Sequence, residues 1–375
     1  MDKFRQLFPV TEEWAYLNHC AVSPLATPVV AAMQRFLDDQ QRNGVTNVVA
    51  WHKELKETRR KAAALINATP DEVAFVRNTV EGVSIVAEGL PWREGDNVVT
   101  VHGEYPANVY PWFNLESRGV ETRVVPDRAG RVVLDDLFAA VDARTRLMAL
   151  SFVEFTNGFR NDLVAAGELC RRQGVLFLVD AIQGLGALPL DTQEAQIDFL
   201  AAGAHKWLLG PPGIGIFFCR LERLDQLRLI QAGPASMVPR GEYLPYEFTL
   251  RPNAQRFEPG AQNYPGIYGL GAILDLLAEA GIANVEAHLW ALLDFAVAAL
   301  RARGCEILSS LEPGERSGMI AFRSPQIATP DLVAKLTAAK VAVSARSGGI
   351  RIAPHLYNDH GDIERLLDEV PADKQ

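Results

Sequence analysis

One lysine stands apart in this sequence. Lys206 is the only lysine between Ala62 and Pro330, and the glycine-rich turn Gly210-Pro-Pro-Gly213 follows it closely. An amine that is partly removed from water loses its proton more readily and can attack a carbonyl group to form an imine, which arginine cannot do. The sequence therefore predicts that Lys206 forms a Schiff base. The alternative is a chance lysine on a loop.

A carboxylate is expected to face this lysine. Asp180 ends the apolar run Val-Leu-Phe-Leu-Val-Asp, and Gln183 follows about one turn later. In an open parallel sheet, ligands bind beyond the carboxyl ends of the strands. An aspartate there, opposite a lysine, is the arrangement that pyridoxal phosphate requires, because the carboxylate keeps the pyridine nitrogen protonated. The alternative for Asp180 is a helix cap or a turn residue.

Two other segments predict groups around the same edge. The stretch Phe75-Val-Arg-Asn-Thr-Val-Glu-Gly82 leads from a strand into a helix that begins near Asn78 or Thr79. The free amides of a helix N-terminus bind phosphate, and the Thr79 hydroxyl adds a donor; a routine N-cap is the alternative. Tyr105, after the next strand, is placed to lie flat on a bound ring, or else to pack under its loop.

The composition favours a small-molecule partner. At 375 residues, with 48% apolar and 22% charged residues, the chain is expected to fold into about two to three domains. A net charge of −9 disfavours nucleic acid and anionic membranes as partners. The start of the chain lacks a signal-peptide pattern, and no apolar stretch reaches membrane-spanning length, so we expect a cytoplasmic protein.

Other kinds of site have weak support in the sequence. The four cysteines form no Cys-x-x-Cys pair, which predicts reduced thiols, and no His/Cys cluster indicates a metal. Gly184-Leu-Gly186 has Pro189 where a dinucleotide fingerprint needs its third glycine. No Gly-x-Ser-x-Gly motif exists to anchor a hydrolase triad.

The pattern of apolar runs predicts the fold. A helix is expected from Thr27, as its N-cap, to Gly44, and a second over 51–66. Strand-like runs then alternate with helices, which indicates a doubly wound, mainly parallel α/β sheet. The runs are 73–76, 98–101, 120–125, 147–153, 175–179 and 214–219. After about residue 245 the pattern changes to long helices and short strands. We expect a large domain over 16–250 and a smaller α+β domain formed by 1–15 and 251–375.

With these motifs together, the chain resembles the class V aminotransferase family of fold-type I pyridoxal-phosphate enzymes. That family includes cysteine desulfurases, selenocysteine lyases, kynureninases and isopenicillin N epimerase. The resemblance runs from Tyr16-Leu-Asn-His-Cys-Ala-Val-Ser-Pro24 to Arg351-Ile-Ala-Pro-His-Leu-Tyr-Asn358. Its strongest piece is Ala204-His-Lys-Trp with Gly210-Pro-Pro-Gly-Ile-Gly215.

The resemblance implies a role for each matching residue. Lys206 would carry the cofactor, Asp180 would pair with its ring nitrogen, and Gln183 would donate to its phenolic oxygen. The remaining residues would contact the phosphate, the ring or the substrate. Asn78, Thr79, the Val80 amide and His205 belong to the phosphate end, Tyr105 stands where relatives have a stacking histidine, Arg351 would bind the substrate carboxylate, and Asn18, His19 and Arg346 would line the substrate pocket.

Departures from the family pattern narrow the chemistry. Desulfurases carry a nucleophilic cysteine before the carboxylate-binding arginine, but this chain has no cysteine after Cys305. Persulfide-forming activity is therefore disfavoured. Phe155 stands where desulfurases often have asparagine. In relatives a serine and a threonine contact the phosphate, and these positions correspond to Gly203 and about Ala261 here. Gln262 and Asn263 are candidates to replace the missing phosphate contacts.

These inferences lead to one expected activity. We predict a homodimer that uses pyridoxal phosphate to act on the α-carbon of an amino acid, with Lys206 as the general base. Transamination is favoured over an eliminating or C–S lyase, and the lyase over an amino-acid epimerase. A non-catalytic binding module is the alternative of a different class.

Overall fold

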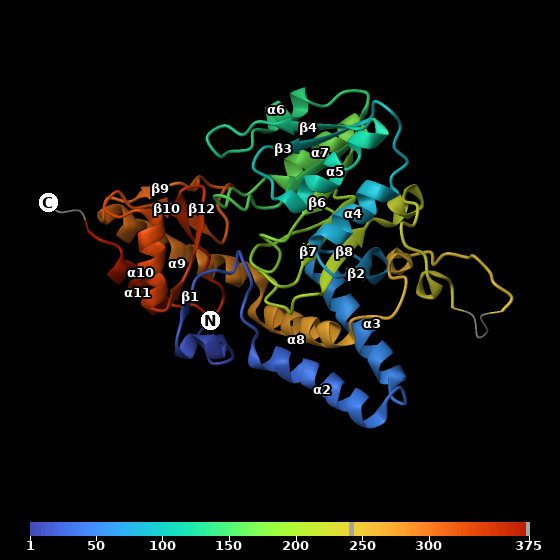
Figure 1. Ribbon diagram of the computed structural model, residues 1–375, viewed down its shortest axis with the longest axis horizontal. Coiled ribbons are helices and arrows are strands. Elements are labelled where there is room, and N and C mark those ends of the chain that lie inside the picture. Colours follow the sequence, from blue (N-terminus) through green and yellow to red (C-terminus); the bar gives the residue numbers. More distant parts are fainter. Residues whose placement is uncertain (240–243, 373–375) are drawn as a thin grey trace.

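The computed structural model describes residues 1–239 and 244–372, which form two bodies side by side (Figure 1). The larger body is built on a seven-stranded sheet. Its strands, in spatial order, are β2 (Val73–Val76), β8 (Gly215–Cys219), β7 (Phe199–Gly203), β6 (Leu176–Asp180), β5 (Thr145–Ser151), β3 (Asn97–Val101) and β4 (Glu121–Val125). All neighbouring strands run parallel except β8, which is antiparallel to both β2 and β7. The predicted doubly wound, mainly parallel sheet is thus confirmed.

The antiparallel strand was not foreseen, and its cause lies in the connection before it. A parallel pair needs a crossover connection, usually a helix, whereas an antiparallel pair can be joined by a direct turn. Between β7 and β8 the chain carries only the Lys206 segment and the glycine-rich turn, with no helix. The chain therefore returns beside β7 in the opposite direction.

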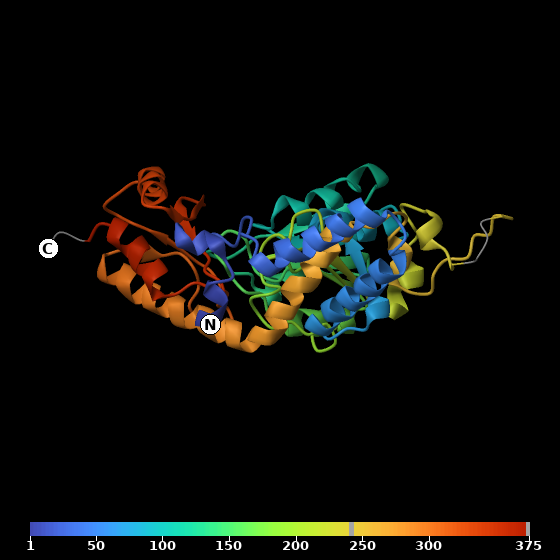
Figure 2. The same cartoon turned by 90° about the horizontal axis from the view of Figure 1, so that it is seen from below.

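Helices cover both faces of this sheet, and alternate strand residues enter two separate cores. In β2, Val73 and Phe75 pack in one core, and Ala74 and Val76 in the other. The first core lies under α2 (Thr27–Asn43), α3 (Val48–Leu65), α6 (Leu134–Ala139), α7 (Leu163–Gln173) and α8 (Tyr264–Ala280). Figure 2 shows α8 beside α2 and α3. The second core lies under α4 (Thr79–Gly89) and α5 (Tyr110–Phe113).

One helix boundary differs from the sequence prediction. The N-cap of α2 is Ala26, with an extended backbone, and Thr27 is the first helical residue. The amide of Thr27 donates to the Leu7 carbonyl at 2.8 Å, so the N-terminal segment satisfies a donor that a capping side chain would otherwise take. The predicted Thr27 cap is therefore wrong, although Pro28 still lies in the first turn as expected.

The smaller body holds an antiparallel four-stranded sheet. Its order is β12 (Ser344–Arg346), β13 (Gly349–Ile352), β10 (Ile320–Arg323) and β9 (Glu306–Ile307). It packs with α9 (Ile282–Ala302), α10 (Thr329–Ala338) and α11 (His360–Glu369). A parallel pair joins β1 (Ala15–Tyr16) to β11 (Val341–Ala342), and the chain begins with α1 (Asp2–Arg5). The long helices and short strands predicted after residue 245 are thus present, and the domain boundaries at 15 and 250 stay predictions.

The helix α9 is long and apolar enough, by length and composition, to cross a membrane. Its buried residues, which include Leu289, Leu292 and Leu300, pack within the protein. Core helices commonly have this composition, so it carries no inference about a membrane.

Candidate active site

The strand ends bring the lysine and the aspartate to one edge of the large sheet. Asp180 is the last residue of β6, and the parallel strand β7 ends at Gly203, three residues before Lys206. The Lys206 amine lies 5.3 Å from the centroid of the Tyr105 ring, which follows β3. Three separate segments of the chain therefore converge as the sequence predicted.

The charges of this edge influence one another. Burial lowers the pKa of the Lys206 amine, the Asp180 carboxylate raises it, and the charges of Arg351 and Arg346 lower it. Burial raises the pKa of Asp180 to about 6, against the lowering effects of the Ile182 amide and of Lys206. At neutral pH the carboxyl group is thus mostly ionised, and the amine loses its proton more easily than a solvated lysine does.

Asp180 has one oxygen that the described residues leave unsatisfied. Its Oδ1 accepts from the Ile182 amide at 3.0 Å, whereas the buried Oδ2 has no hydrogen-bond partner within the described chain. A buried carboxylate oxygen without a partner is costly and calls for a donor or a cation. The protonated ring nitrogen of pyridoxal phosphate meets that need, so the residues present fit the cofactor.

The predicted phosphate end lies at the start of α4. Asn78 is the N-cap and accepts from the Glu81 amide at 2.9 Å. The Thr79 hydroxyl accepts from the Gly203 amide at 3.0 Å and keeps its own hydrogen to donate, while Val80 is 44% exposed. Close by, burial and the charge of Lys206 lower the pKa of His205. The helix start and the lysine loop are thus joined directly.

Aromatic side chains form the outer wall of this site. The Tyr105 and Phe155 rings meet edge to face with their centroids 5.2 Å apart. Tyr105, 43% exposed, also lines a cavity of about 480 Å³ together with Val80 and Tyr110. Neither Lys206 nor Asp180 lines this cavity.

Gln183 is held in place from two sides. Its Oε1 accepts from Trp207 Nε1 at 3.0 Å, and its Nε2 donates to the Cys20 carbonyl at 3.2 Å. One amide hydrogen of Gln183 remains for a ligand. The contact with Trp207 fixes the segment that carries Lys206.

Arg351 enters the site from the small sheet, as a residue of β13. Only 2% of this residue is exposed, and its Nε donates to Ser344 Oγ at 3.2 Å while Nη1 donates to the Phe155 carbonyl. No carboxylate of residues 1–239 or 244–372 pairs with it. A buried guanidinium without an acidic partner is suited to bind a substrate carboxylate.

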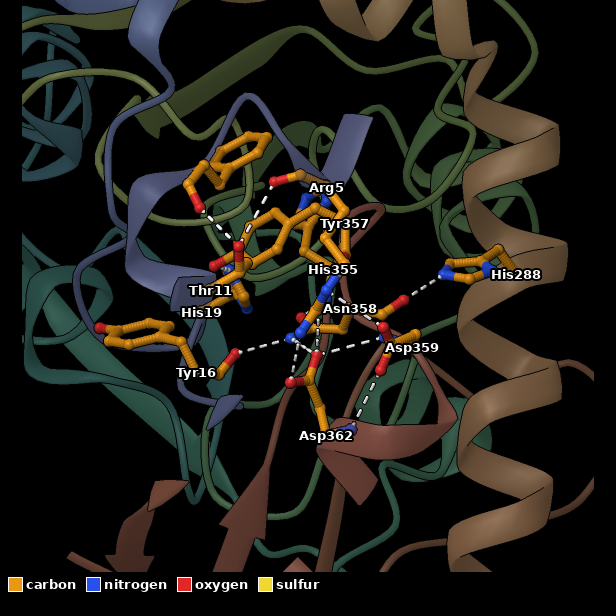
Figure 3. Close-up of polar contacts among 11 residues, drawn as sticks. Arg5, Thr11, Tyr16, His19, His288, His355, Tyr357, Asn358, Asp359 and Asp362 are labelled. Carbon is orange, nitrogen blue, oxygen red and sulfur yellow. Dashed lines mark hydrogen bonds and ion pairs between the residues drawn. The ribbon is translucent and has the colours of Figure 1, made fainter. Parts of the chain in front are cut away.

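The two residues predicted from the N-terminal loop lie in different surroundings. Asn18 accepts from the Cys20 thiol at 3.4 Å. His19 is fully buried, with Nδ1 2.7 Å from the Ala353 carbonyl and Nε2 2.8 Å from the Tyr357 hydroxyl, in the cluster of Figure 3. Both nitrogens of His19 are therefore engaged by the protein, which gives it a structural position.

Gln262 and Asn263 also have protein partners. Gln262 Nε2 donates to Glu258 at 3.1 Å, and Asn263 caps α8 by accepting from the Gly266 amide at 3.1 Å. Asn263 also donates to the Gly213 carbonyl of the glycine-rich turn at 2.9 Å. The structure shows no contact of either side chain with Lys206, and their compensating role at the phosphate stays a prediction.

Sequence reasoning missed two buried acids behind the site. Glu104 accepts from the amide and the hydroxyl of Ser151, both at 2.5 Å, and burial together with the Glu154 charge raises its pKa well above the ordinary value. Burial raises the pKa of Glu154 to about 8. Both acids follow apolar strand runs, as Asp180 does, and this position was the signal that would have identified them.

Cys20, one of the predicted reduced thiols, is buried in the first core and also borders the site. Its thiol is 3.7 Å from Ser344 Oγ, and its charge influences the pKa values of both Lys206 and Arg351. In the part of the chain that the structure describes, no three His, Cys, Asp or Glu side chains form a group that could hold a metal ion.

Comparisons with known proteins agree with this arrangement. A family model described as aminotransferase class V matches residues 15–366. An uncharacterized aminotransferase of Bacillus subtilis, YcbU, is 30% identical over 374 residues, which cover 99% of this chain and 97% of that protein. A probable cysteine desulfurase of Methanothermobacter thermautotrophicus is 33% identical over 292 residues, covering 76% of this chain and 72% of the relative.

Solved structures share the fold. The cysteine desulfurase CsdA of Escherichia coli superposes with a TM-score of 0.87 at 26% identity, covering 98% of this chain and 96% of CsdA. A cysteine desulfurase of Thermococcus onnurineus, solved in its apo form, gives a TM-score of 0.90 at 24% identity, with coverage of 98% and 96%. The similarity confirms the predicted α/β fold.

Proposed function

Because this chain belongs to the class V aminotransferase family of pyridoxal-phosphate enzymes, we propose that it acts at the α-carbon of an amino acid. One observation supports this most strongly. The buried Oδ2 of Asp180 has no partner among the described residues, at the same sheet edge as the amine of Lys206. A buried carboxylate oxygen without a partner can accept a hydrogen bond from a protonated ring nitrogen.

The cofactor would be held by residues from both ends of this edge. Pyridoxal phosphate, when bound, supplies an aldehyde carbon and a ring that accepts the electrons of a carbanion. Asp180 would keep the ring nitrogen protonated, and Gln183 would offer its free amide hydrogen. Thr79, His205 and the first turn of α4 would hold the phosphate, and Tyr105, whose ring centroid lies 5.3 Å from the Lys206 amine, would contact the ring.

The remaining steps belong to the protein. Lys206, whose pKa burial lowers, takes the α-proton as general base and returns it. Arg351 binds the α-carboxylate and so fixes which bond faces the base. Burial raises the pKa of both Glu104 and Glu154, which disfavours negative charge on these acids behind Asp180.

We infer transamination as the outcome, because the chain lacks a cysteine in the loop over 344–351 and none follows Cys305. The test supplies the holoenzyme with a panel of amino acids, with and without a keto-acid acceptor. Conversion of the bound cofactor to its amine form by one amino acid, reversed by a keto acid, supports transamination. Release of a keto acid in many turnovers without an acceptor contradicts it and indicates elimination.

A C–S lyase is the second candidate, and Cys20 favours it. This thiol lies beside Ser344 and near Arg351, and relatives of the chain are described as cysteine desulfurases. The lyase requires sulfide or persulfide release from L-cysteine or L-cystine, which a sulfide assay measures. Retention of full lyase activity in Cys20→Ser would exclude the thiol from the reaction. An epimerase would racemise its substrate without releasing a keto acid.

We also propose that the protein is a homodimer. A segment that projects from the large body carries the apolar side chains Tyr246, 89% exposed, and Phe248, 73% exposed (Figure 1). Exposed apolar side chains of this size are typical of a protein interface. Sedimentation of the holoenzyme tests this, because Tyr246→Ser/Phe248→Ser should weaken a dimer, and a monomeric wild type would contradict it.

A further inference from the structure

We propose that this site selects amino acids with an anionic side chain, with Arg346 binding that anion while Arg351 binds the α-carboxylate. This substrate class rests on the proposed function, because it assumes that the amino acid is bound at Lys206. The inference comes from the geometry and the charges of the hairpin formed by β12 and β13.

The hairpin presents both arginines on one face. Ser344 pairs with Arg351, and Arg346 pairs with Gly349 two residues further along the antiparallel ladder. Side chains alternate between the faces of a strand, so Ser344, Arg346 and Arg351 share a face, and Ile350 lies on the other. Ile350 is buried in the core of the small body. The opposite face, with both guanidinium groups, is therefore the one that meets the active site.

Two effects show that these guanidinium charges are close to the reacting amine. After burial and the charges of Asp180 and Cys20, Arg351 and then Arg346 influence the pKa of Lys206, and both lower it. Burial, together with the Arg346 charge, also lowers the pKa of Arg351, against a raising effect of Cys20. Three positive groups thus face the same space, with Arg351 deep in the site and Arg346 at its exposed rim.

The described residues do not neutralise this charge. Arg346 Nη1 donates to the adjacent Ala345 carbonyl at 3.0 Å, and no carboxylate of residues 1–239 or 244–372 pairs with it. On the neighbouring strand β10, by contrast, Arg323 pairs with Glu306 at 3.0 Å. Asp180 is required at the ring nitrogen. An α-carboxylate would pair with Arg351, which leaves Arg346 at the rim available to bind a second anion on the same substrate.

The experiment uses the holoenzyme and two pairs of amino acids of matched shape. L-aspartate is compared with L-asparagine, and L-glutamate with L-glutamine, by the half-reaction rate at subsaturating concentration. We expect kcat/KM to favour the acidic member of at least one pair by roughly 10- to 100-fold, the range expected for a hydrogen bond to a charged group. In Arg346→Gln that ratio should fall toward one, and Arg346→Lys should restore part of it.

Arg301→Gln, which removes an exposed arginine from α9, is the matched control and should keep the wild-type ratio. Equal rates for acidic and neutral members in the wild type would overturn the inference, as would an unchanged ratio in Arg346→Gln. The visible absorbance of bound pyridoxal phosphate separates the two proposals. A protein that binds the cofactor and turns over neutral amino acids equally well contradicts the substrate class alone. A protein that never binds the cofactor contradicts the proposed function.

Discussion

Two buried polar clusters of this molecule differ in how far the protein satisfies them. Around Lys206, the buried oxygens Asp180 Oδ2 and Glu154 Oε2 have no hydrogen-bond partner among the described residues. Where the N-terminal segment meets the small body, the cluster of Figure 3 also contains buried polar side chains, among them His19, His355 and Asp362, but the atoms of these side chains are paired. Burial alone therefore does not identify a functional site.

This difference in hydrogen-bond pairing distinguishes polar groups that are available to a ligand from polar groups that stabilise the fold. In the Figure 3 cluster, Asp362 accepts from Arg5 at 2.8 Å and from Asn358 at 2.8 Å, and His355 lies 2.9 Å from the Trp207 carbonyl. These contacts link the chain ends to the segment that carries Lys206. The Figure 3 cluster, whose polar atoms are paired, thus positions the site, and the group around Lys206, which has unpaired oxygens, supplies its chemistry.

Removal of the amine should have the largest effect. Lys206→Ala should lower the turnover of the best amino acid by at least about 10⁴-fold, because the general base is lost. The thermal midpoint of unfolding of the cofactor-free protein should change little or rise, since a buried cation is removed. Turnover within tenfold of wild type would mean that another group takes the proton.

Replacement of the aspartate should lower activity and raise stability together. Asp180→Asn should reduce kcat/KM by roughly 100-fold or more, because the ring nitrogen loses its charged partner. Burial raises the pKa of Asp180 from 3.8 to about 6, so ionisation opposes folding at pH 7 by up to about 3 kcal/mol. Denaturant unfolding of the cofactor-free variant should therefore show increased stability. A clear loss of stability would contradict the difference drawn between the Lys206 site and the Figure 3 cluster.

The stability that the Figure 3 cluster contributes should fall at acidic pH. Burial lowers the pKa of His19 from 6.5 to about 4, so the folded protein keeps this imidazole neutral while the unfolded chain takes up a proton. Its contribution is fully present above pH 6.5 and is lost, by up to about 3 kcal/mol, as the pH falls to about 4. His19→Gln should give a flatter pH profile of unfolding free energy, and identical slopes would contradict this assignment.

The smallest expected change concerns the ion pair of the same cluster. Asp362→Asn should destabilise the protein by about 2 kcal/mol, less than for a fully buried pair, because the Arg5 side chain is 29% exposed. This loss of stability is opposite in sign to the gain expected for Asp180→Asn. Unfolding curves of both variants in one buffer measure it, and stabilisation by Asp362→Asn would contradict the contrast between the clusters.

The sequence was a good guide to the fold where periodicity reports burial. Strands such as β3 and β6 are buried throughout because helices cover both faces of the sheet, and their mainly apolar residues show this in the sequence alone. The antiparallel direction of β8 and the start of α2 were not predictable in the same way. The start of α2 depends on the contact of Thr27 with Leu7, twenty residues earlier in the chain, and the direction of β8 depends on the direct connection from β7.

The candidate site was predictable where a residue follows a strand and less so elsewhere. Lys206, Asp180 and Tyr105 follow strands whose ends meet, which local patterns indicate. His19 was predicted at the substrate, but its partners Ala353 and Tyr357 lie more than three hundred residues away and only the fold brings them together. The contact of Cys20 with Ser344 joins similarly distant residues, and the sequence alone did not predict it.

The most direct test of the central claim is a spectral titration of the purified protein with pyridoxal phosphate, followed by borohydride reduction and peptide mapping. A visible absorbance band should appear on binding, and reduction should leave the cofactor covalently attached to the peptide that contains Lys206. A protein that stays colourless with added cofactor, or a label on a different lysine, would contradict the account.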